Sequence, residues 1–168
     1  MKKILILLSA IVLFTACPNY VDEDFYSKYK PVLMNRENLE NSIMFLSARQ
    51  MCATGKIYFK DNYIYISERY LGVHVIDNSN PSLPENIGFI SVPGSIDLAM
   101  KNNILYVDNS VDLVAIDLSK GFANLEVTTR LKDVFPELVP PDGKIMKSIF
   151  TKENRPENTY IVGWEEIK

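Results

Sequence analysis

The chain has 168 residues with 18 basic and 21 acidic side chains, and its formal net charge is −3 at pH 7. An acidic surface repels nucleic-acid phosphates and anionic headgroups, which excludes a nucleic-acid-binding function. The chain has 1 histidine and 2 cysteines, so neither a metal site built from several imidazoles nor a disulfide framework is expected.

Residues 1–16 are predicted to be a lipoprotein signal peptide. Two lysines precede an apolar run over residues 4–14, which has the length of a signal-peptide core. The run is shorter than the roughly 20 residues that a membrane-spanning helix needs. The motif LFTAC, which ends at Cys17, resembles the lipobox of bacterial lipoprotein precursors, although Phe14 departs from the commonest form. The resemblance implies lipidation of Cys17 and an outer-membrane lipoprotein on the periplasmic face or the cell surface; the alternative is a secretory signal with an incidental cysteine.

Residues 17–41 are expected to form the lipid-anchored tether and the lead-in to the fold. The acidic triplet DED at residues 22–24 follows closely on Cys17. It fits either a solvated tether or a signal like those that send some Bacteroidetes lipoproteins to the outer face of the outer membrane. A weak helical period occurs only in NRENLENSIMFL, which starts at Asn35. Because a lipidated Cys17 leaves Cys52 without a partner, Cys52 is expected to be a buried small hydrophobic residue.

The next part of the chain repeats itself at an interval of about 40 residues, which is typical of propeller blades. KDNYIYIS at Lys60 matches KNNILYVD at Lys101, and GVHVID at Gly72 matches DLVAID at Asp112. Each apolar run is rich in β-branched and aromatic residues and is bounded by turn residues, which predicts strands. The runs lack clean alternation, which favours strands covered on both faces.

Turn residues separate the predicted strands. Asp61-Asn62 and Asn102-Asn103 suit hairpin turns with positive φ. NPSLPEN is predicted to be a connector within the first unit, and VPGS is predicted to mark the crossing into the next. Asp77 and Asp117 recur at the same place in both units, which favours a turn-stabilising role over a pair of catalytic carboxylates.

The stretch GVHVIDNSNPSLPENIGFISVPGSIDLAMKNNILYVDNSVDLVAIDLS closely resembles the LVIVD repeat. The preceding GKIYFKDNYIYISE is similar to the start of an uncharacterised group of Bacteroidetes lipoproteins built from such repeats. The resemblance covers residues 55–119 and departs at VHVID, which places a histidine in an apolar strand. It implies a β-propeller on the cell envelope and carries no established reaction.

The predicted fold is therefore all-β, with antiparallel sheets of a β-propeller type over residues 42–168. Two to three blades are expected, with KIMKSIFT and TYIVGWEEI as strands of the third unit. A closed propeller uses about four to eight blades, so these units cannot close a ring. Three explanations stay open: a truncated form of a longer lipoprotein, self-association, or an open stack capped by its own termini.

Candidate site residues are few. His74 and Glu68 fit either core packing or a site at a blade edge, and packing is favoured because Val114 takes the place of His74 in the other unit. Asp97, Asp108 and Asp112 are weak ligand-binding candidates without metal-ligand spacing. Neither a metal nor a cofactor is expected, because phosphate, dinucleotide and nucleophile-elbow motifs are absent from the sequence. The aromatic residues that fit either a sugar- or peptide-binding face or the core are Tyr63, Tyr65, Tyr70, Tyr106 and Trp164.

The sequence favours a non-enzymatic, lipid-anchored module that serves in binding or as an envelope scaffold. Its expected partners are the membrane, through Cys17, a protein or glycan, and further copies of the chain. One alternative is an envelope hydrolase or lyase whose acids converge in loops. A further alternative is a remnant of a longer propeller lipoprotein. The acids of the enzymatic alternative are Glu68, Asp97, Asp108 and Asp112.

Overall fold

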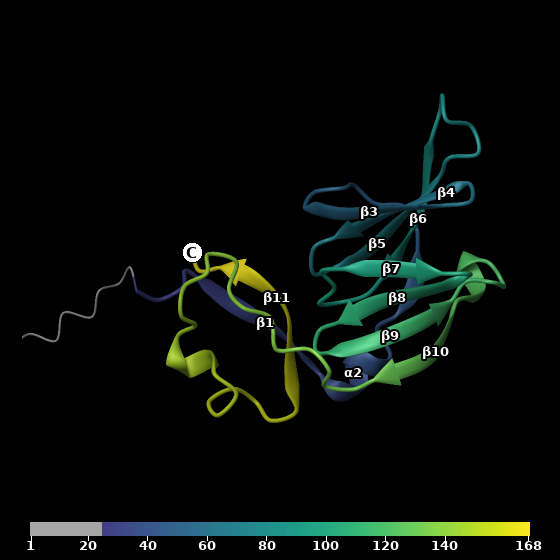
Figure 1. Cartoon of the computed structure of the whole chain (residues 1–168). Coiled ribbons are helices and arrows are strands. Elements are labelled where there is room, and N and C mark those ends of the chain that lie inside the picture. Colours follow the sequence, from purple (N-terminus) through teal and green to yellow (C-terminus); the bar gives the residue numbers. More distant parts are fainter. Residues whose placement is uncertain (1–24) are drawn as a thin grey trace, which may run out of the picture.

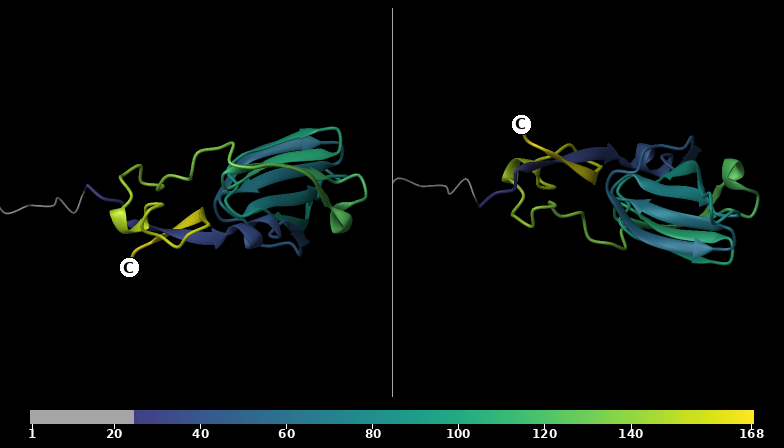
Figure 2. Two further views of the ribbon diagram at one scale, coloured as in Figure 1. Left: turned by 90° about the horizontal axis from the view of Figure 1, so that it is seen from below. Right: turned by 90° about the horizontal axis from the view of Figure 1, so that it is seen from above.

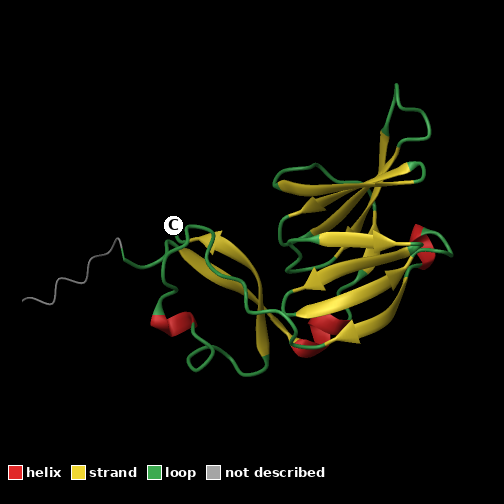
Figure 3. Cartoon of the chain, in the orientation of Figure 1, coloured by secondary structure: helices red, strands yellow, loops and turns green. Residues whose placement is uncertain are grey.

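The computed structural model describes residues 25–168, so the predicted signal peptide, Cys17 and the acidic triplet lie outside the described residues. The described chain is all-β with three antiparallel sheets (Figures 1 and 3), which confirms the predicted fold class. Its strands are β1 (Tyr29–Asn35), β2 (Met44–Leu46), β3 (Thr54–Lys60), β4 (Tyr63–Glu68), β5 (Gly72–Asp77), β6 (Glu85–Ser91), β7 (Leu98–Lys101), β8 (Ile104–Asn109), β9 (Asp112–Asp117), β10 (Glu126–Leu131) and β11 (Thr159–Glu166). Its helices are α2 (Arg36–Glu40) and the 3-10 turns η1 (Phe122–Asn124) and η2 (Ser148–Phe150).

The two predicted repeat units form two blades. The first blade has the strand order β2-β6-β5-β4-β3, and the second has the order β10-β9-β8-β7. Asp61 and Asn102 open the β3–β4 and β7–β8 turns with φ of 54° each, as their hairpin role predicts. The register is also repeated, because Ile66 pairs with His74 in the first blade as Val107 pairs with Val114 in the second.

Each blade has two faces, which we call face A and face B. Residues paired across strands share a face, so the strand register assigns every side chain. Face B of the first blade packs on face A of the second, and Figure 2 shows the two sheets stacked. Face B of the first blade comprises Tyr58, Tyr63, Tyr65, Val73 and Val75. Face A of the second comprises Leu98, Met100, Leu105, Val107, Val114 and Ile116.

This interface between the blades is the main hydrophobic core of the described residues. Phe122 of η1 closes one end of it, with ring centroids 5.0 Å from Tyr63 and 5.6 Å from Phe45. The hydroxyl of Tyr58 on β3 donates to the carbonyl of Met100 on β7 at 3.1 Å and links the two blades. Burial of apolar side chains on both contacting faces is what holds the blades together.

Two aspartates stabilise the loops that follow β5 and β9. Asp77 Oδ1 accepts from the backbone N–H of Ser79 at 2.8 Å, and Asp117 Oδ1 accepts from Ser119 at 2.8 Å. Hydrogen bonds from these serines hold the pKa of both carboxyl groups below the usual value. The turn-stabilising role predicted from their recurrence is confirmed.

The third sheet contains only β1 and β11, which pair from Tyr29–Glu166 to Asn35–Thr159. β1 and α2 belong to the segment that the sequence assigns to the tether, so the folded part begins before residue 42. TYIVGWEEI forms β11 as expected. The prediction of a strand for KIMKSIFT is wrong, because irregular chain and η2 occupy that segment. β1 takes the place beside β11 that a neighbouring strand of a third blade would need.

The expected early helix is short. α2 begins where the side chain of Asn35 accepts from the backbone N–H of Asn38 at 2.8 Å, which is an N-cap. It ends at Glu40, and Met44–Leu46 of the same stretch forms β2 at the edge of the first blade. Pairing with β6 therefore overrides the weak helical period in the second half of this stretch.

Candidate binding faces of the two blades

The five candidate residues lie in three places and do not form a single site. Glu68 and His74 form a buried pair on face A of the first blade. Asp112 lies in a buried cluster with two arginines. Asp97 and Asp108 line a pocket on face B of the second blade.

The pair of Glu68 and His74 belongs to the packing of the first blade. His74 Nε2 lies 3.0 Å from Glu68 Oε2, and the imidazole meets the ring of Phe89 at a centroid distance of 4.9 Å. The carboxylate also accepts from the backbone N–H groups of Cys52 and Ala53, which fixes the chain before β3 against this face. Burial alone would raise the pKa of Glu68, but these backbone donors and His74 outweigh it and hold the pKa below its usual value.

The position of the segment before β3 also explains why Cys52 is exposed. The amide of Cys52 points to Glu68, whereas the side chain is exposed. The prediction that Cys52 is a buried small hydrophobic residue is therefore wrong, because the segment crosses the surface of the blade and does not enter the core.

Replacing Glu68 with glutamine is expected to lower the free energy of unfolding at pH 7 by about 1–3 kcal/mol, because the buried donors lose a charged acceptor. Since the folded-state pKa of Glu68 is lowered, its contribution is complete above the unfolded pKa of about 4.3 and is lost as pH falls through the folded pKa. Urea unfolding at several pH values should therefore show a flatter acid limb for the variant. Glu126→Gln, which changes an exposed ion pair with Lys120, serves as the control; equal stability of Glu68→Gln and wild type at pH 7 would contradict this role.

Asp112 is held at the start of β9 by groups far away in the sequence. Its Oδ2 lies 2.5 Å from Arg36 Nη1 and 2.8 Å from Arg130 Nη1. Its Oδ1 accepts from the backbone N–H of Asp133 at 3.1 Å. Burial would raise the pKa of Asp112, but the two arginines and the Asp133 amide keep it below the usual value. Asp112 thus joins α2, β9 and the chain after β10.

Asp108 and Asp97 make contacts that have a counterpart in the first blade. Asp108 Oδ1 accepts from the backbone N–H of Asp97 at 2.8 Å, as the hydroxyl of Ser67 accepts from the N–H of Lys56 at 2.8 Å. The strand register makes Ser67 the repeat equivalent of Asp108 and Lys56 the equivalent of Asp97. Because the same hydrogen bond recurs in both blades, it has a structural role.

The remaining carboxylate oxygens are also engaged. Both oxygens of Asp108 accept from the N–H of Ile96, at 3.0 and 2.8 Å, and burial raises the pKa of this carboxyl group. Asp97 accepts from the N–H of Leu98 at 2.6 Å and pairs with Lys56 Nζ at 2.6 Å. Neither carboxylate is left free to act as a base or a nucleophile.

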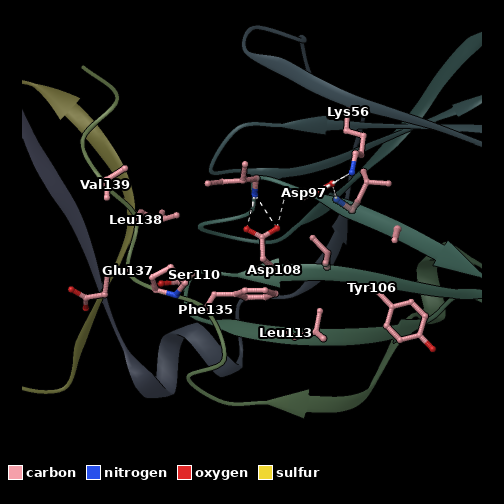
Figure 4. A pocket seen from close by; sticks show the side chains of 15 residues that line it. Lys56, Asp97, Tyr106, Asp108, Ser110, Leu113, Phe135, Glu137, Leu138 and Val139 are labelled. Atoms are coloured by element: carbon pink, nitrogen blue, oxygen red, sulfur yellow. Dashed lines mark hydrogen bonds and ion pairs between the residues drawn. The ribbon is translucent and has the colours of Figure 1, made fainter. Parts of the chain in front are cut away.

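A pocket of about 510 Å³ lies between face B of the second blade and the chain after β10 (Figure 4). Its blade side includes Tyr106 and Leu113, and Phe135, Leu138 and Val139 form the opposite wall. Glu137 also lines it and pairs with Arg155. Residues 135–139 were missed by the sequence reasoning, because only the hydrophobic character of FPELV sets this non-repeating segment apart. The pocket is an apolar recess in a blade face that remains partly open.

Face A of the first blade is open along β3, and its repeat equivalent shows the difference. Ile57 and Phe59 on β3 are 65% and 61% exposed. Their equivalents in the second blade, Leu98 and Met100, are 3% and 9% exposed because the first blade covers them. The chain therefore exposes on β3 apolar side chains whose equivalents in the second blade are buried against the first blade.

The aromatic candidates divide between core and pockets. Tyr65 is buried and Tyr63 half-buried between the blades, whereas Tyr106 is exposed at the pocket. Tyr70 and Trp164 line a separate pocket beside the β1–β11 sheet. Core packing, which the sequence favours, holds for the tyrosines between the blades but does not describe the other three.

Within residues 25–168, no cluster of three or more histidine, cysteine or acidic side chains is arranged to hold a metal ion. In the same range, no helix is long and apolar enough to cross a membrane.

Comparison with known proteins adds no relative. No protein family, no curated protein and no solved structure matches the chain. What the protein does is therefore inferred from its own sequence and geometry.

Proposed function

We propose that the chain is a lipid-anchored envelope protein of the LVIVD-repeat β-propeller type that acts by binding and scaffolding rather than by catalysis. Lipidated Cys17 would attach it to the outer membrane, and residues 17–28 would link the lipid to the first strand. The LFTAC motif and the repeated blade sequence support this proposal. Its acidic composition argues against nucleic acid as a partner.

The observation that carries the proposal is the exposed apolar edge of face A on β3 of the first blade. Ile57 and Phe59 expose apolar side chains at positions where the second blade buries Leu98 and Met100. Exposed apolar side chains that lie together on one strand are costly in water and are typical of a binding surface. A partner that covers it must present a surface similar to face B of a blade.

A second copy of the chain carries such a surface. Face B of its second blade is partly open and includes Tyr106, which is 36% exposed, whereas the equivalent Tyr65 in the first blade is 4% exposed. Face A of one copy would then rest on face B of the next, continuing the arrangement within each chain. Such a contact joins two different surfaces, so it is heterologous and adds further copies until a ring closes or a filament grows.

The test uses two variants of the full chain in detergent, studied by sedimentation velocity. Phe59→Lys places a charge on face A, and Tyr106→Lys places one on face B. Burial of an unpaired charge is unfavourable, so each variant alone is expected to sediment as a monomer at concentrations where the wild type assembles. An equimolar mixture is expected to form a 1:1 complex, because each variant keeps the face that the other lacks.

Two outcomes would overturn this proposal. A wild-type chain that stays monomeric over the whole concentration range would remove self-assembly through these faces. A single variant that still pairs with itself would indicate a contact between two identical faces. Leu83→Lys, in the exposed loop between β5 and β6, is the control and should assemble like the wild type.

The hydrolase or lyase alternative has one observation in its favour. Asp108 lines a pocket, and burial raises its pKa, as in many general acids. Its oxygens are nevertheless engaged by the backbone N–H groups of Ile96 and Asp97, and Ser67 accepts the equivalent hydrogen bond in the first blade. Glu68 and Asp112, the other acids of this hypothesis, are buried in structural clusters elsewhere. Binding is therefore the better supported function.

A further inference from the structure

A second pocket of about 510 Å³ lies where the β1–β11 sheet meets the end of the first blade. The sheet contributes Trp164, the β4–β5 turn contributes Arg69 and Tyr70, and the chain between β2 and β3 contributes Arg49. The lining does not include Ile57, Phe59 or Tyr106, the exposed residues of the proposed assembly. It collects two cations and two large aromatic side chains at one junction of the fold.

The arginines in this pocket differ from every other arginine of the described residues. Arg36, Arg130 and Arg155 each pair with a carboxylate. Within residues 25–168, Arg49 and Arg69 form no ion pair and instead lie beside aromatic rings. The Cζ atom of Arg49 lies 4.9 Å from the ring centroid of Phe89, and that of Arg69 lies 5.7 Å from Tyr70. The guanidinium groups are thus placed on apolar supports with their donors unused.

A further donor in the same pocket lacks an acceptor. The Nε1 atom of Trp164 is buried and makes no hydrogen bond to any group of residues 25–168. A buried N–H without an acceptor costs about 1–3 kcal/mol, so an acceptor that reaches it is favourable. The two guanidinium groups have no protein acceptor among residues 25–168, and a negatively charged ligand suits them.

The backbone of Tyr70 fixes the position of its side chain. Tyr70 has a φ of 66°, which is rare for a bulky residue. Two backbone hydrogen bonds hold it there: its N–H donates to the carbonyl of Ser95 at 2.7 Å, and its carbonyl accepts from Gly94 at 2.9 Å. Ser110, in the corresponding turn between β8 and β9, has a φ of 60°, so this conformation belongs to the turn of each blade. Here the turn places the Tyr70 side chain in the lining of the pocket.

We propose that this pocket binds a small carboxylate-bearing ring compound. The planar fork of a guanidinium matches a carboxylate in a bidentate manner, and Arg49 and Arg69 could share its two oxygens. Tyr70 and Trp164 offer aromatic surface to the ring of the ligand. Glu165 also lines the pocket, but Lys30 Nζ lies 3.3 Å from its carboxylate and offsets this charge. The two arginines therefore leave the site positively charged.

The test exploits the fact that the chain has 1 tryptophan. Because Trp164 lines the pocket, its fluorescence in the full-length protein reports binding directly. The probes are benzoate and glucuronate as carboxylates with a flat aromatic ring and a sugar ring, glucose as the neutral sugar, and inorganic phosphate as the tetrahedral anion. At constant ionic strength, a saturable change in Trp164 fluorescence is expected with a carboxylate and none with glucose. Whichever of benzoate and glucuronate binds more tightly identifies the class of ring.

Substitution of the arginines separates a specific site from general quenching. Arg49→Gln and Arg69→Gln are each expected to weaken carboxylate binding by about tenfold or more, because each removes a charged hydrogen bond. Lys120→Gln, which removes an exposed cation from the loop after β9, should bind like the wild type. Far-ultraviolet circular dichroism checks that all three variants are folded.

Three results would overturn the proposal: no saturable change with either carboxylate, saturation with phosphate alone, or equal affinity in the arginine variants and the wild type. The proposed assembly can fail without affecting this result, because sedimentation reads the blade faces and Trp164 fluorescence reads the pocket.

Discussion

Replacing Asp112 with asparagine is expected to lower the free energy of unfolding by about 3–5 kcal/mol, because it removes the carboxylate that pairs with Arg130 and one of those that pair with Arg36. The side chain of Asp112 is fully buried, and both Arg36 and Arg130 direct Nη1 to its Oδ2. Its other oxygen accepts from the Asp133 amide, and an asparagine satisfies only part of this set. A loss of this size is a large fraction of the total stability of a domain. Urea unfolding followed by circular dichroism measures it.

Asp97→Asn is the matched control for this prediction. Asp97 also pairs with a cation at 2.6 Å, but both partners are more than half exposed. Exposed ion pairs contribute about 0–1 kcal/mol, so this variant should unfold close to the wild type. If Asp112→Asn costs no more than Asp97→Asn, the cluster does not hold α2 and β10 to the second blade.

Replacing Leu98 with alanine is expected to cost about 2–5 kcal/mol, because its side chain fills the core between the blades. The repeat supplies its control. Ile57 occupies the equivalent position in the first blade and is largely exposed. Ile57→Ala is therefore expected to change the free energy of unfolding by less than about 0.5 kcal/mol when the chain is dilute.

The comparison is made by urea unfolding at low protein concentration, where no assembly covers Ile57. Equal losses for the two variants would show that face A of the first blade is already covered within one chain. A small loss for Leu98→Ala would show that the blades do not pack through the faces described above.

The blades could be predicted from the sequence because their signals are local. YIYI and VHVI lie in β4 and β5, and ILYV and LVAI lie in β8 and β9. Asp61, Asn102 and Gly94 adopt the positive φ that their turns require. The roles of Asp77 and Asp117 were likewise predictable, because a carboxylate two residues before a serine is a short-range signal.

The remaining elements depend on contacts between distant parts of the chain. β1 pairs with β11, and no local pattern indicates which strand completes that sheet. KIMKSIFT has the composition of a strand, but it forms only a single β-bridge, between Ile145 and Tyr26, and Ile149 stays exposed. Short apolar runs become strands only where a partner edge exists, so composition alone misassigned this one.

The candidate sites show the same limit. The sequence joined Glu68 to His74, which are close along the chain, but it could not find Arg36 as the partner of Asp112. Arg49 and Arg69 gave no signal, because an unpaired arginine is identified only when its surroundings are known. A pocket whose lining comes from separate segments of the chain cannot be predicted from any local sequence motif.

The central claim is that the open face A of one chain is covered by face B of another copy, and site-specific photo-crosslinking in intact cells tests it most directly. Benzoylphenylalanine would replace Ile57 on face A or, as a control, Leu83 in the exposed loop. After illumination, the account predicts a crosslinked dimer from position 57 alone, with the attachment in the β7–β9 region of the second copy that contains Tyr106. No adduct at position 57, or an adduct only with a different protein, would contradict the account.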